Sequence, residues 1–462
     1  MRKNETILDN IDWSLILLYF VLTILGLFNI YSASFNEEYP SIFSFSQEYG
    51  KQIIWIAISM FLGFIVLLLE KDVLWKYAYW FYGFCMFLLV AVLFTREING
   101  ARSWLGVGSM GIQPSEFAKL GTAIAISAYI SGMNIKLQSQ RSAFYANMIV
   151  VFPMLLILLQ PDAGTFIVFT SFLWVFYREG ISYDFILGSL LRLIPFVDHT
   201  RIKVGSNFIP LLVVSGILVV STLLLSQSSI QLFGYALDGY WGLIVSIGVF
   251  LILALIVVRL TVMLRERKKL YYVLIVAAIA SSSLVFAVNS VFGYLKSHQK
   301  ERIELFLGLD EDPDGKDYNR NRAMAAVGSG GFFGKGYHEA TLASPQQGHV
   351  PMQSTDFIFC TLAEEWGFVG GLIVLSLFIV LLFKIIQIAE RQRSTFTRVF
   401  AYSVAVIIFY HLAINIGMTI GLAPVIGIPL PFFSYGGSSL MSFTMMLFVL
   451  AKLDSERKNV FR

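Results

Sequence analysis

Charged residues and cysteines are scarce in this chain of 462 residues, and their scarcity excludes several classes of protein. Only 14% of the residues are charged, against roughly a quarter in an ordinary soluble domain. The two cysteines, Cys85 and Cys360, lie in or beside apolar runs far apart in the sequence, which favours packing over a disulfide framework. The net charge of +4 forms no basic patch suited to nucleic acid, so we expect no nucleic-acid partner.

Long apolar runs are abundant instead. Apolar residues make up 57% of the chain, and the mean hydropathy is +0.72. Runs of about 17 to 25 residues, the length that spans the hydrocarbon of a bilayer, recur throughout and leave no room for a separate soluble domain. The sequence therefore predicts one membrane domain, 1–462, with an all-α fold: a polytopic transmembrane bundle of about twelve helices. We place them at 13–33, 51–69, 75–94, 117–133, 145–159, 165–178, 207–226, 240–263, 270–292, 357–383, 399–422 and 433–452.

The distribution of Lys and Arg predicts the orientation. If the amino terminus is cytoplasmic, basic clusters fall at every second junction and in the tail, as the positive-inside rule requires, and both termini are cytoplasmic. The outer face then receives residues 96–116, the turn at 160–165 and a long extracellular loop, 293–356. This loop contains Lys335 within the glycine-rich run GSGGFFGKG, which favours sharp bends that let a ligand approach; a flexible hinge without a ligand is the alternative.

Charged residues gather at the start of the helix predicted at 117–133. Glu116 and Lys119 share one helix face at the i, i+3 spacing, and Arg102 precedes them, so we expect the three to cluster at the outer membrane surface. Ionisable residues in membrane helices suggest function. A purely structural ion pair is the alternative.

Three further carboxylates are candidates. Asp162 lies in the outer turn QPDAGT, where capping of the next helix is the alternative role. Asp356, in STDFIF, stands at the outer entrance of a helix; as a simple cap it would have a lowered pKa. Glu364 lies about 80° around that helix from Asp356, so it can share the same cavity, whereas Glu365 lies about 180° away.

The segment 415–439 is rich in proline and glycine and ends in FFSYGGSS, which includes Ser434 and Tyr435. Irregular backbone at membrane depth survives only where protein buries it or where it lines a wet cavity. We interpret this segment as a cavity wall, with a packing kink as the alternative.

Read together, NGARSWLGVGSMGIQPSEFAKL, QPDAGT, GSGGFFGKG, STDFIF with AEEWGFVGG, and NIGMTIGLAPVIGIPLPFFSYGGSS resemble the SEDS family of RodA and FtsW type peptidoglycan glycosyltransferases. GSGGFFGKG and VIGIPLP resemble the RodA type, which acts in cell elongation and shape maintenance. The resemblance implies a core of ten helices, so 207–263 would be an inserted helix pair. It also implies the substrate lipid II, a class B penicillin-binding transpeptidase as partner, and a place in the bacterial cytoplasmic membrane among its lipids.

The resemblance places the family's essential carboxylate on Asp356 and supporting charges on Glu116 and Lys119. In the expected reaction, Asp356 is the general base for an attacking sugar hydroxyl, and Arg102 and Lys119 stabilise the departing pyrophosphate, with a divalent cation such as Mg²⁺ or Mn²⁺ as a further candidate and no organic cofactor. The alternatives are a flippase for the same lipid-linked precursor and a non-catalytic scaffold for a transpeptidase. Charges near the outer face argue against transport, because carriers bind near the midplane.

Overall fold

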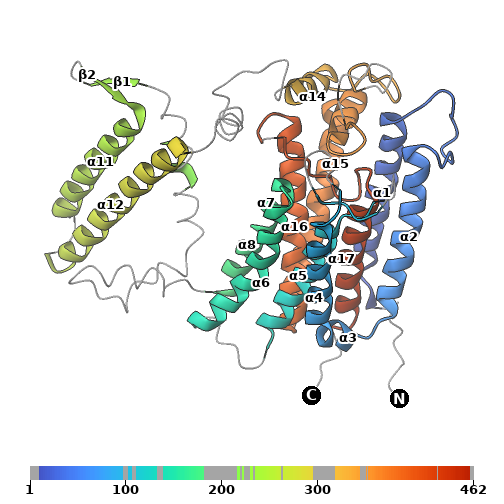
Figure 1. Ribbon diagram of the computed structural model, residues 1–462, viewed down its shortest axis with the longest axis horizontal. Helices are drawn as coiled ribbons and strands as arrows, with labels where there is room; N and C mark the ends of the chain where they lie inside the picture. Colours follow the sequence, from blue (N-terminus) through green and yellow to red (C-terminus); the bar gives the residue numbers. More distant parts are fainter. Residues whose placement is uncertain are drawn as a thin grey trace. The chain divides into compact units, whose positions relative to one another are not determined.

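The computed structural model divides the chain into two compact units, residues 1–179 with 313–462, and residues 180–312. It describes residues 10–96, 102–106, 111–132, 139–181, 216–218, 221–222, 229–232, 235–261, 264–294, 318–343, 350, 352–423 and 425–457. The first unit is a bundle of upright helices (Figure 1). Its elements are α1 (Trp13–Ala33), α2 (Glu48–Leu68), α3 (Lys71–Lys76), α4 (Ala78–Val92), α5 (Pro114–Ile130), α6 (Gln140–Leu159), α7 (Ala163–Phe169), α8 (Phe172–Glu179), α14 (Tyr318–Ser329), α15 (Ile358–Arg391), α16 (Thr395–Thr419) and α17 (Gly437–Ser455).

The predicted membrane-spanning character is confirmed. Seven helices in the described parts of the chain are long and apolar enough to cross a bilayer, and α4 is a shorter apolar helix. The predicted helix 165–178 is instead two short helices, α7 and α8, separated at Thr170 and Ser171. The predicted helix 207–226 lies outside the described residues except for 216–218 and 221–222, which are helical. The other predicted helices have counterparts, most with bounds within a few residues, although α12 begins six residues earlier and α15 ends eight residues later than predicted.

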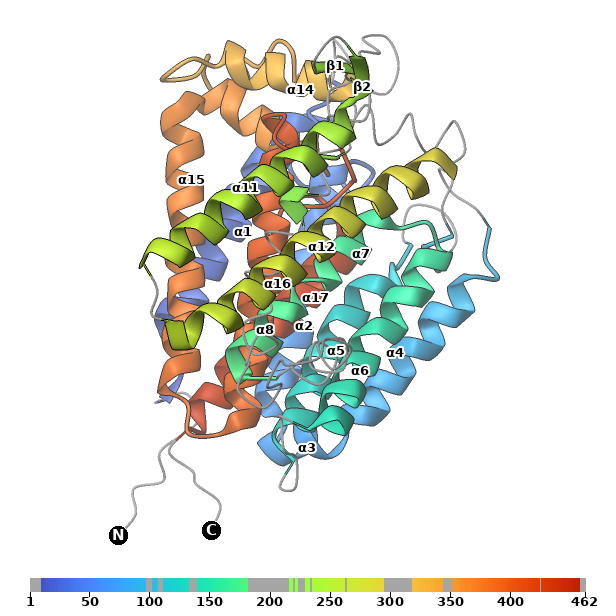
Figure 2. The ribbon, with the colours of Figure 1, turned by 90° about the vertical axis from the view of Figure 1, so that its left-hand side faces the viewer.

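Helices α5 and α17 form the centre of the bundle. α17 packs against α2, α5 and α16, and α5 also contacts α4 and α6 (Figure 2). Small residues make this close packing feasible: a Cβ on Gly121 would lie 3.0 Å from the sulfur of Cys85, and a Cβ on Gly63 would lie 2.8 Å from the ring of Phe448. Because α5 is buried on nearly all sides, polar side chains on it face protein and not lipid.

One end of the bundle carries a network of ion pairs. Arg391, at the end of α15, pairs with Asp12 just before α1 at 2.9 Å, and its Nε donates to Asp454 near the end of α17, also at 2.9 Å. The start of α1 and the end of α17 therefore lie at the same end of the bundle. The starts of α5, α7, α15 and α17 lie at the opposite end, which we call the site end.

The predicted long loop 293–356 contains a helix that the sequence did not predict. α14 lies across the site end (Figure 1), and its Ala323 and Ala326 pack with Phe357 and Cys360 in a small hydrophobic cluster. With twelve residues and two arginines, α14 carries no signal of a membrane span. Burial of its alanine face against the start of α15 stabilises it there.

The second unit contains two long apolar helices, α11 (Gly239–Thr261) and α12 (Leu264–Tyr294), which pack against each other. A short antiparallel hairpin precedes them, formed by β1 (Ser229–Leu232) and β2 (Tyr235–Asp238). The prediction of a helical bundle holds, with these two four-residue strands as the exception within the described residues. The inserted pair 207–263 remains a prediction, because most of 207–226 is not described.

Candidate active site

Asp356 lies at the site end, in the turn before α15, and is half-buried. It does not cap α15, because Phe357 holds the N-cap position and no side-chain capping bond forms. Burial, and next the negative charge of Asp162, raise the pKa of Asp356 to about 6. The cap alternative, which required a lowered pKa, is therefore wrong: the carboxylate faces a partly dehydrated space beside a second acid.

The loop after α16 forms a wall against this carboxylate. A Cβ added to Gly427, whose φ is +68°, would lie 3.2 Å from Oδ2 of Asp356. The side-chain amide of Asn415 donates to the backbone oxygens of Asp356 at 2.8 Å and of Ile428 at 2.7 Å, which ties the wall to the turn. The interpretation of 415–439 as a wall beside the candidate site fits this placement.

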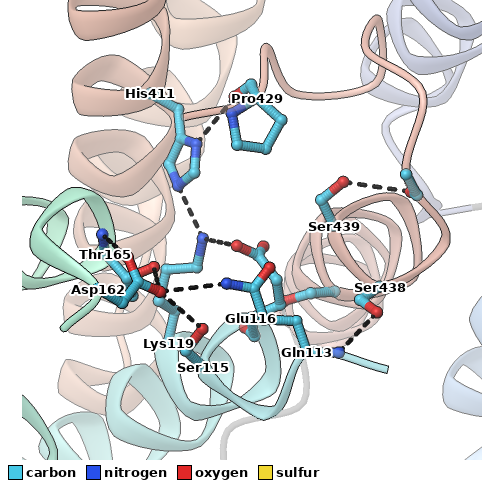
Figure 3. A network of polar contacts seen from close by, with 12 residues as sticks. Gln113, Ser115, Glu116, Lys119, Asp162, Thr165, His411, Pro429, Ser438 and Ser439 are labelled. Carbon is cyan, nitrogen blue, oxygen red and sulfur yellow. Dashed lines mark hydrogen bonds and ion pairs between the residues drawn. The ribbon is translucent and has the colours of Figure 1, made fainter. Parts of the chain in front are cut away.

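Asp162 caps α7 and also joins it to the start of α5 (Figure 3). It accepts hydrogen bonds from the Thr165 backbone nitrogen at 2.9 Å and the Thr165 hydroxyl at 2.8 Å. It accepts two more at the start of α5, from the Gln113 amide at 3.1 Å and the Ser115 hydroxyl at 3.5 Å. The expected cap on the next helix is therefore present, but capping is not the whole role, because the same carboxylate binds the start of α5 and contributes to the field at Asp356.

Glu116 and Lys119 lie inside the bundle, with side chains 3% and 0% exposed. The Lys119 ammonium donates to Glu116 at 2.9 Å, contacts Nε2 of His411 at 2.7 Å and lies 5.0 Å from the ring centre of Phe443 (Figure 3). We expected Glu116 and Lys119 to cluster with Arg102 at the outer membrane surface. The structure corrects this expectation for Glu116 and Lys119: α5 is enclosed by its neighbours, so these two residues pair inside the bundle. Arg102 itself is exposed.

His411 was not among the predicted site residues. It lies on α16 one turn before Asn415, and its Nδ1 contacts the backbone oxygen of Pro429 at 3.0 Å. Two strongly polar side chains at i, i+4 within an apolar helix were the available signal, because such residues are costly in a membrane segment.

Ser434 and Tyr435 hold the other end of the wall. The Leu430 backbone nitrogen donates to the Ser434 hydroxyl at 2.8 Å, and the Tyr435 backbone nitrogen donates to the Ser354 backbone oxygen at 2.9 Å. The second bond connects the wall to the segment that carries Asp356. In this structure both residues contribute through these contacts to the shape of the site.

Glu364 and Lys335 form an ion pair that joins α15 to the outer loop. Glu364 accepts six hydrogen bonds, including those from Lys335 at 2.5 Å, the Leu342 nitrogen at 2.9 Å and the Ala343 nitrogen at 2.7 Å. The glycine-rich run approaches α15 closely, since a Cβ on Gly334 would lie 2.1 Å from the Glu365 oxygen. The run thus bends to meet the protein's own helix, and the hydrogen bonds of Glu364 tie α15 to the outer loop.

The described residues offer little to a protein-bound metal. No group of three His, Cys, Asp or Glu that could hold an ion occurs among them. Asp162 accepts four hydrogen bonds, three of them on Oδ2 and one on Oδ1.

The model of the FtsW/RodA/SpoVE family, described as "Cell cycle protein", matches residues 12–217 and 243–459. This chain belongs to that family. The internal stretch between the two matched parts, 218–242, falls within the predicted insertion 207–263. The family match thus includes both the Asp356 turn and the helices that pack around it.

Named relatives cover nearly the whole chain. "Peptidoglycan glycosyltransferase RodA" of Treponema pallidum is 34% identical, over 97% of this chain and 98% of the relative. "Peptidoglycan glycosyltransferase MrdB" of Escherichia coli K12 is 28% identical, over 97% and 95%.

Solved structures agree in fold. One, described as "Structural coordination of polymerization and crosslinking by a peptidoglycan synthase complex", has a TM-score of 0.63 at 24% identity, over 97% of this chain and 98% of that chain. The rod shape determining protein RodA of Thermus thermophilus has a TM-score of 0.57 at 22% identity, over 97% of both chains. At these identities the likeness shows that the family's fold is shared.

Proposed function

We propose that this family member is a peptidoglycan glycosyltransferase that polymerises lipid II at the outer face of the bacterial cytoplasmic membrane, in cell elongation and shape maintenance. The observation that carries the proposal is the Asp356 carboxylate, half-buried at the site end with its pKa raised to about 6. Relatives named as peptidoglycan glycosyltransferases support the reaction class, and the RodA relative supports the elongation role.

The orientation follows from the charges at the other end of the bundle. Three arginines lie there: Arg391 is the last residue of α15, Arg398 lies in the first turn of α16, and Arg457 follows α17. Positive charges collect on the cytoplasmic side of membrane proteins, so that end is cytoplasmic and the site end faces outward. A lipid-linked sugar can then keep its tail in the bilayer while its head group reaches Asp356.

Chain growth needs one bond to form and one to break. A sugar hydroxyl of the acceptor attacks the anomeric carbon of the donor, the carbon–oxygen bond to the pyrophosphate breaks, and the configuration inverts. The hydroxyl proton passes to Asp356, which is mostly ionised at neutral pH because its pKa is about 6. A base with a pKa near 6 accepts a proton more readily than an ordinary aspartate does.

The departing pyrophosphate requires positive charge. Arg102 is exposed on the segment that leads into α5, and it is the residue that we assign to this role. Lys119 as packed directs its ammonium at Glu116, His411 and Phe443, so it acts inside the bundle. A divalent cation remains a separate proposal, in which pyrophosphate oxygens would supply most of its ligands; no step above depends on it.

A class B penicillin-binding transpeptidase is the proposed partner. The support is the solved structure that concerns a peptidoglycan synthase complex. The strand polymerised at the outer face is the substrate that such an enzyme would cross-link. Co-purification of the full-length chain with the transpeptidase from one membrane extract tests this pairing, and independent elution of the two in mild detergent contradicts it.

The deciding experiment supplies purified protein and the partner with lipid II in detergent, and measures glycan strands. We expect polymer from the wild type and a loss of about 10²- to 10⁴-fold in rate for Asp356→Asn and Asp356→Ala. Glu339→Gln, an exposed acid of the outer loop, is the matched control. Absence of polymer from every form, with transbilayer movement of lipid II in vesicles, would support a flippase; absence of both would support a scaffold.

A further inference from the structure

The buried histidine of α16 occupies a defined position between the internal ion pair and the wall of the site. His411 is 1% exposed. Its Nδ1 lies 3.0 Å from the Pro429 oxygen and its Nε2 lies 2.7 Å from the Lys119 ammonium. Figure 3 shows the imidazole between the two partners.

The chemistry of these partners determines the tautomer. A backbone carbonyl only accepts hydrogen bonds, so Nδ1 must carry the proton. An ammonium only donates, so Nε2 must present its lone pair. His411 is therefore neutral, with its one N–H directed at the wall.

The wall in turn limits the space of the Asp356 carboxylate. Pro429 follows Ile428, which Asn415 holds at 2.7 Å, and Gly427 lies against Oδ2 of Asp356. Asn415 also binds the backbone of Asp356 at 2.8 Å. His411 and Asn415, one turn apart on α16, thus contact the Ile428–Pro429 backbone, and Asn415 also contacts the backbone of Asp356.

We propose that His411 is a positioning residue for this site: its Nδ1–H, oriented by the Lys119–Glu116 pair, holds the Gly427–Pro429 backbone against Asp356. His411 touches neither substrate nor the reacting atoms in this role. The role rests on the proposed function, since it concerns the base of that reaction. Misplacement of a catalytic group by about 1 Å can cost on the order of 10²-fold in rate. A wall segment that fixes the position of Asp356 therefore affects the rate.

The charged and titratable groups around His411 are few. Helix α5 contributes Lys119 and Glu116, while α17 contributes the uncharged ring of Phe443 at 4.8 Å. Asp162 acts on Lys119 from the start of α7. The neutral form of His411 is consistent with this set, because a second cation beside Lys119 would be repelled.

Three substitutions separate the two contacts of the imidazole. The amide nitrogen of His411→Asn lies where Nδ1 lies and can still donate to Pro429, but the acceptor for Lys119 is lost. The longer His411→Gln places its amide near Nε2, so it keeps an acceptor for Lys119 and loses the bond to the wall. His411→Leu loses both. Ser403→Ala, on the same helix and buried, is the matched control.

We expect kcat for lipid II polymerisation to fall about 10- to 100-fold in His411→Leu and His411→Gln, with KM within about twofold of the wild type. His411→Asn should recover kcat to within about fivefold. Thermal stability should follow the opposite order, with His411→Gln above His411→Asn, because the Lys119 contact supports the bundle. A looser wall also hydrates Asp356, so the acid limb of the kcat profile should move to lower pH in the Leu and Gln variants.

Activity that simply parallels thermal stability across the three variants would overturn the role, as would wild-type kcat in His411→Leu. Asp356→Asn is assayed beside them. Polymerisation by Asp356→Asn at less than about tenfold below the wild-type rate overturns the proposed base and the role of His411 together. An inactive Asp356→Asn with a fully active His411→Leu leaves the proposed function standing and removes His411 alone.

Discussion

Gly427 lies against the carboxylate of Asp356, and its φ of +68° places it in the left-handed region that favours glycine. A side chain at this position would have its Cβ 3.2 Å from Oδ2 of Asp356. The proposed base and the wall are thus in direct contact, across more than seventy residues of sequence.

Gly427→Ala should reduce polymerisation at least about tenfold, because the methyl group displaces the carboxylate by several tenths of an ångström. The left-handed conformation alone costs roughly 1–2 kcal/mol for a non-glycine residue. Gly331→Ala is the control: its φ is +57° but nothing lies within 4 Å of the added Cβ. Equal rates for the two variants, measured with lipid II, would show that backbone strain and not contact with Asp356 matters.

The rate should depend on pH through Asp356. Because the pKa of this group is raised to about 6, kcat should fall as the pH drops through about 6, approaching a tenfold loss per pH unit below it. A pH profile of polymerisation between about 4.5 and 8, with unfolding monitored in parallel, measures this limb. A limb near pH 4, where an ordinary aspartate titrates, would contradict the placement of the group.

Asp356→Asn should stabilise the folded protein near neutral pH. The folded-state pKa lies above the unfolded value, so the stabilising contribution of this group is complete at low pH and is lost as the pH rises through about 6. Replacement by a neutral amide removes that loss. Thermal unfolding in detergent should show a higher midpoint than wild type at pH 7.5, and the difference should shrink as the pH falls from about 6 to about 4 and be absent below that.

Lys119→Met should destabilise the bundle by about 3–5 kcal/mol, because it leaves Glu116 as an unpaired buried charge. Adding Glu116→Gln should restore more than half of the loss. Denaturant unfolding of the single and double variants in the same detergent provides the comparison. If the double variant is as unstable as the sum of the two single variants, the two residues are not acting as a pair.

Glu364→Gln should loosen the outer loop. The carboxylate accepts six hydrogen bonds, from Ser329, Lys335 and residues 341–343. A hydrogen bond to a charged acceptor contributes about 1.5–3 kcal/mol to stability. Hydrogen exchange of the Thr341, Leu342 and Ala343 amides should be at least tenfold faster in the variant. Glu339→Gln, in the same loop but exposed, should leave these rates unchanged.

Much of the fold followed from the sequence. Apolar runs of membrane-spanning length located most helices, because a bilayer requires such runs whatever their neighbours are. The short motifs located Asp162 and Asp356, since turns rich in proline and glycine at helix ends mark where polar residues meet the membrane surface. α14 escaped prediction because its stability comes from packing on Phe357 and Cys360, which lie far along the chain.

The sequence by itself determined that this is a polytopic helical membrane protein with acids at helix entrances, because these features depend on residues close together in the chain. The tertiary structure alone decided which of those residues meet. It buried Lys119 against His411, turned Glu364 toward the outer loop and set Gly427 against Asp356. Pairing across helices depends on how whole helices rotate and pack, and local spacing carries no record of that.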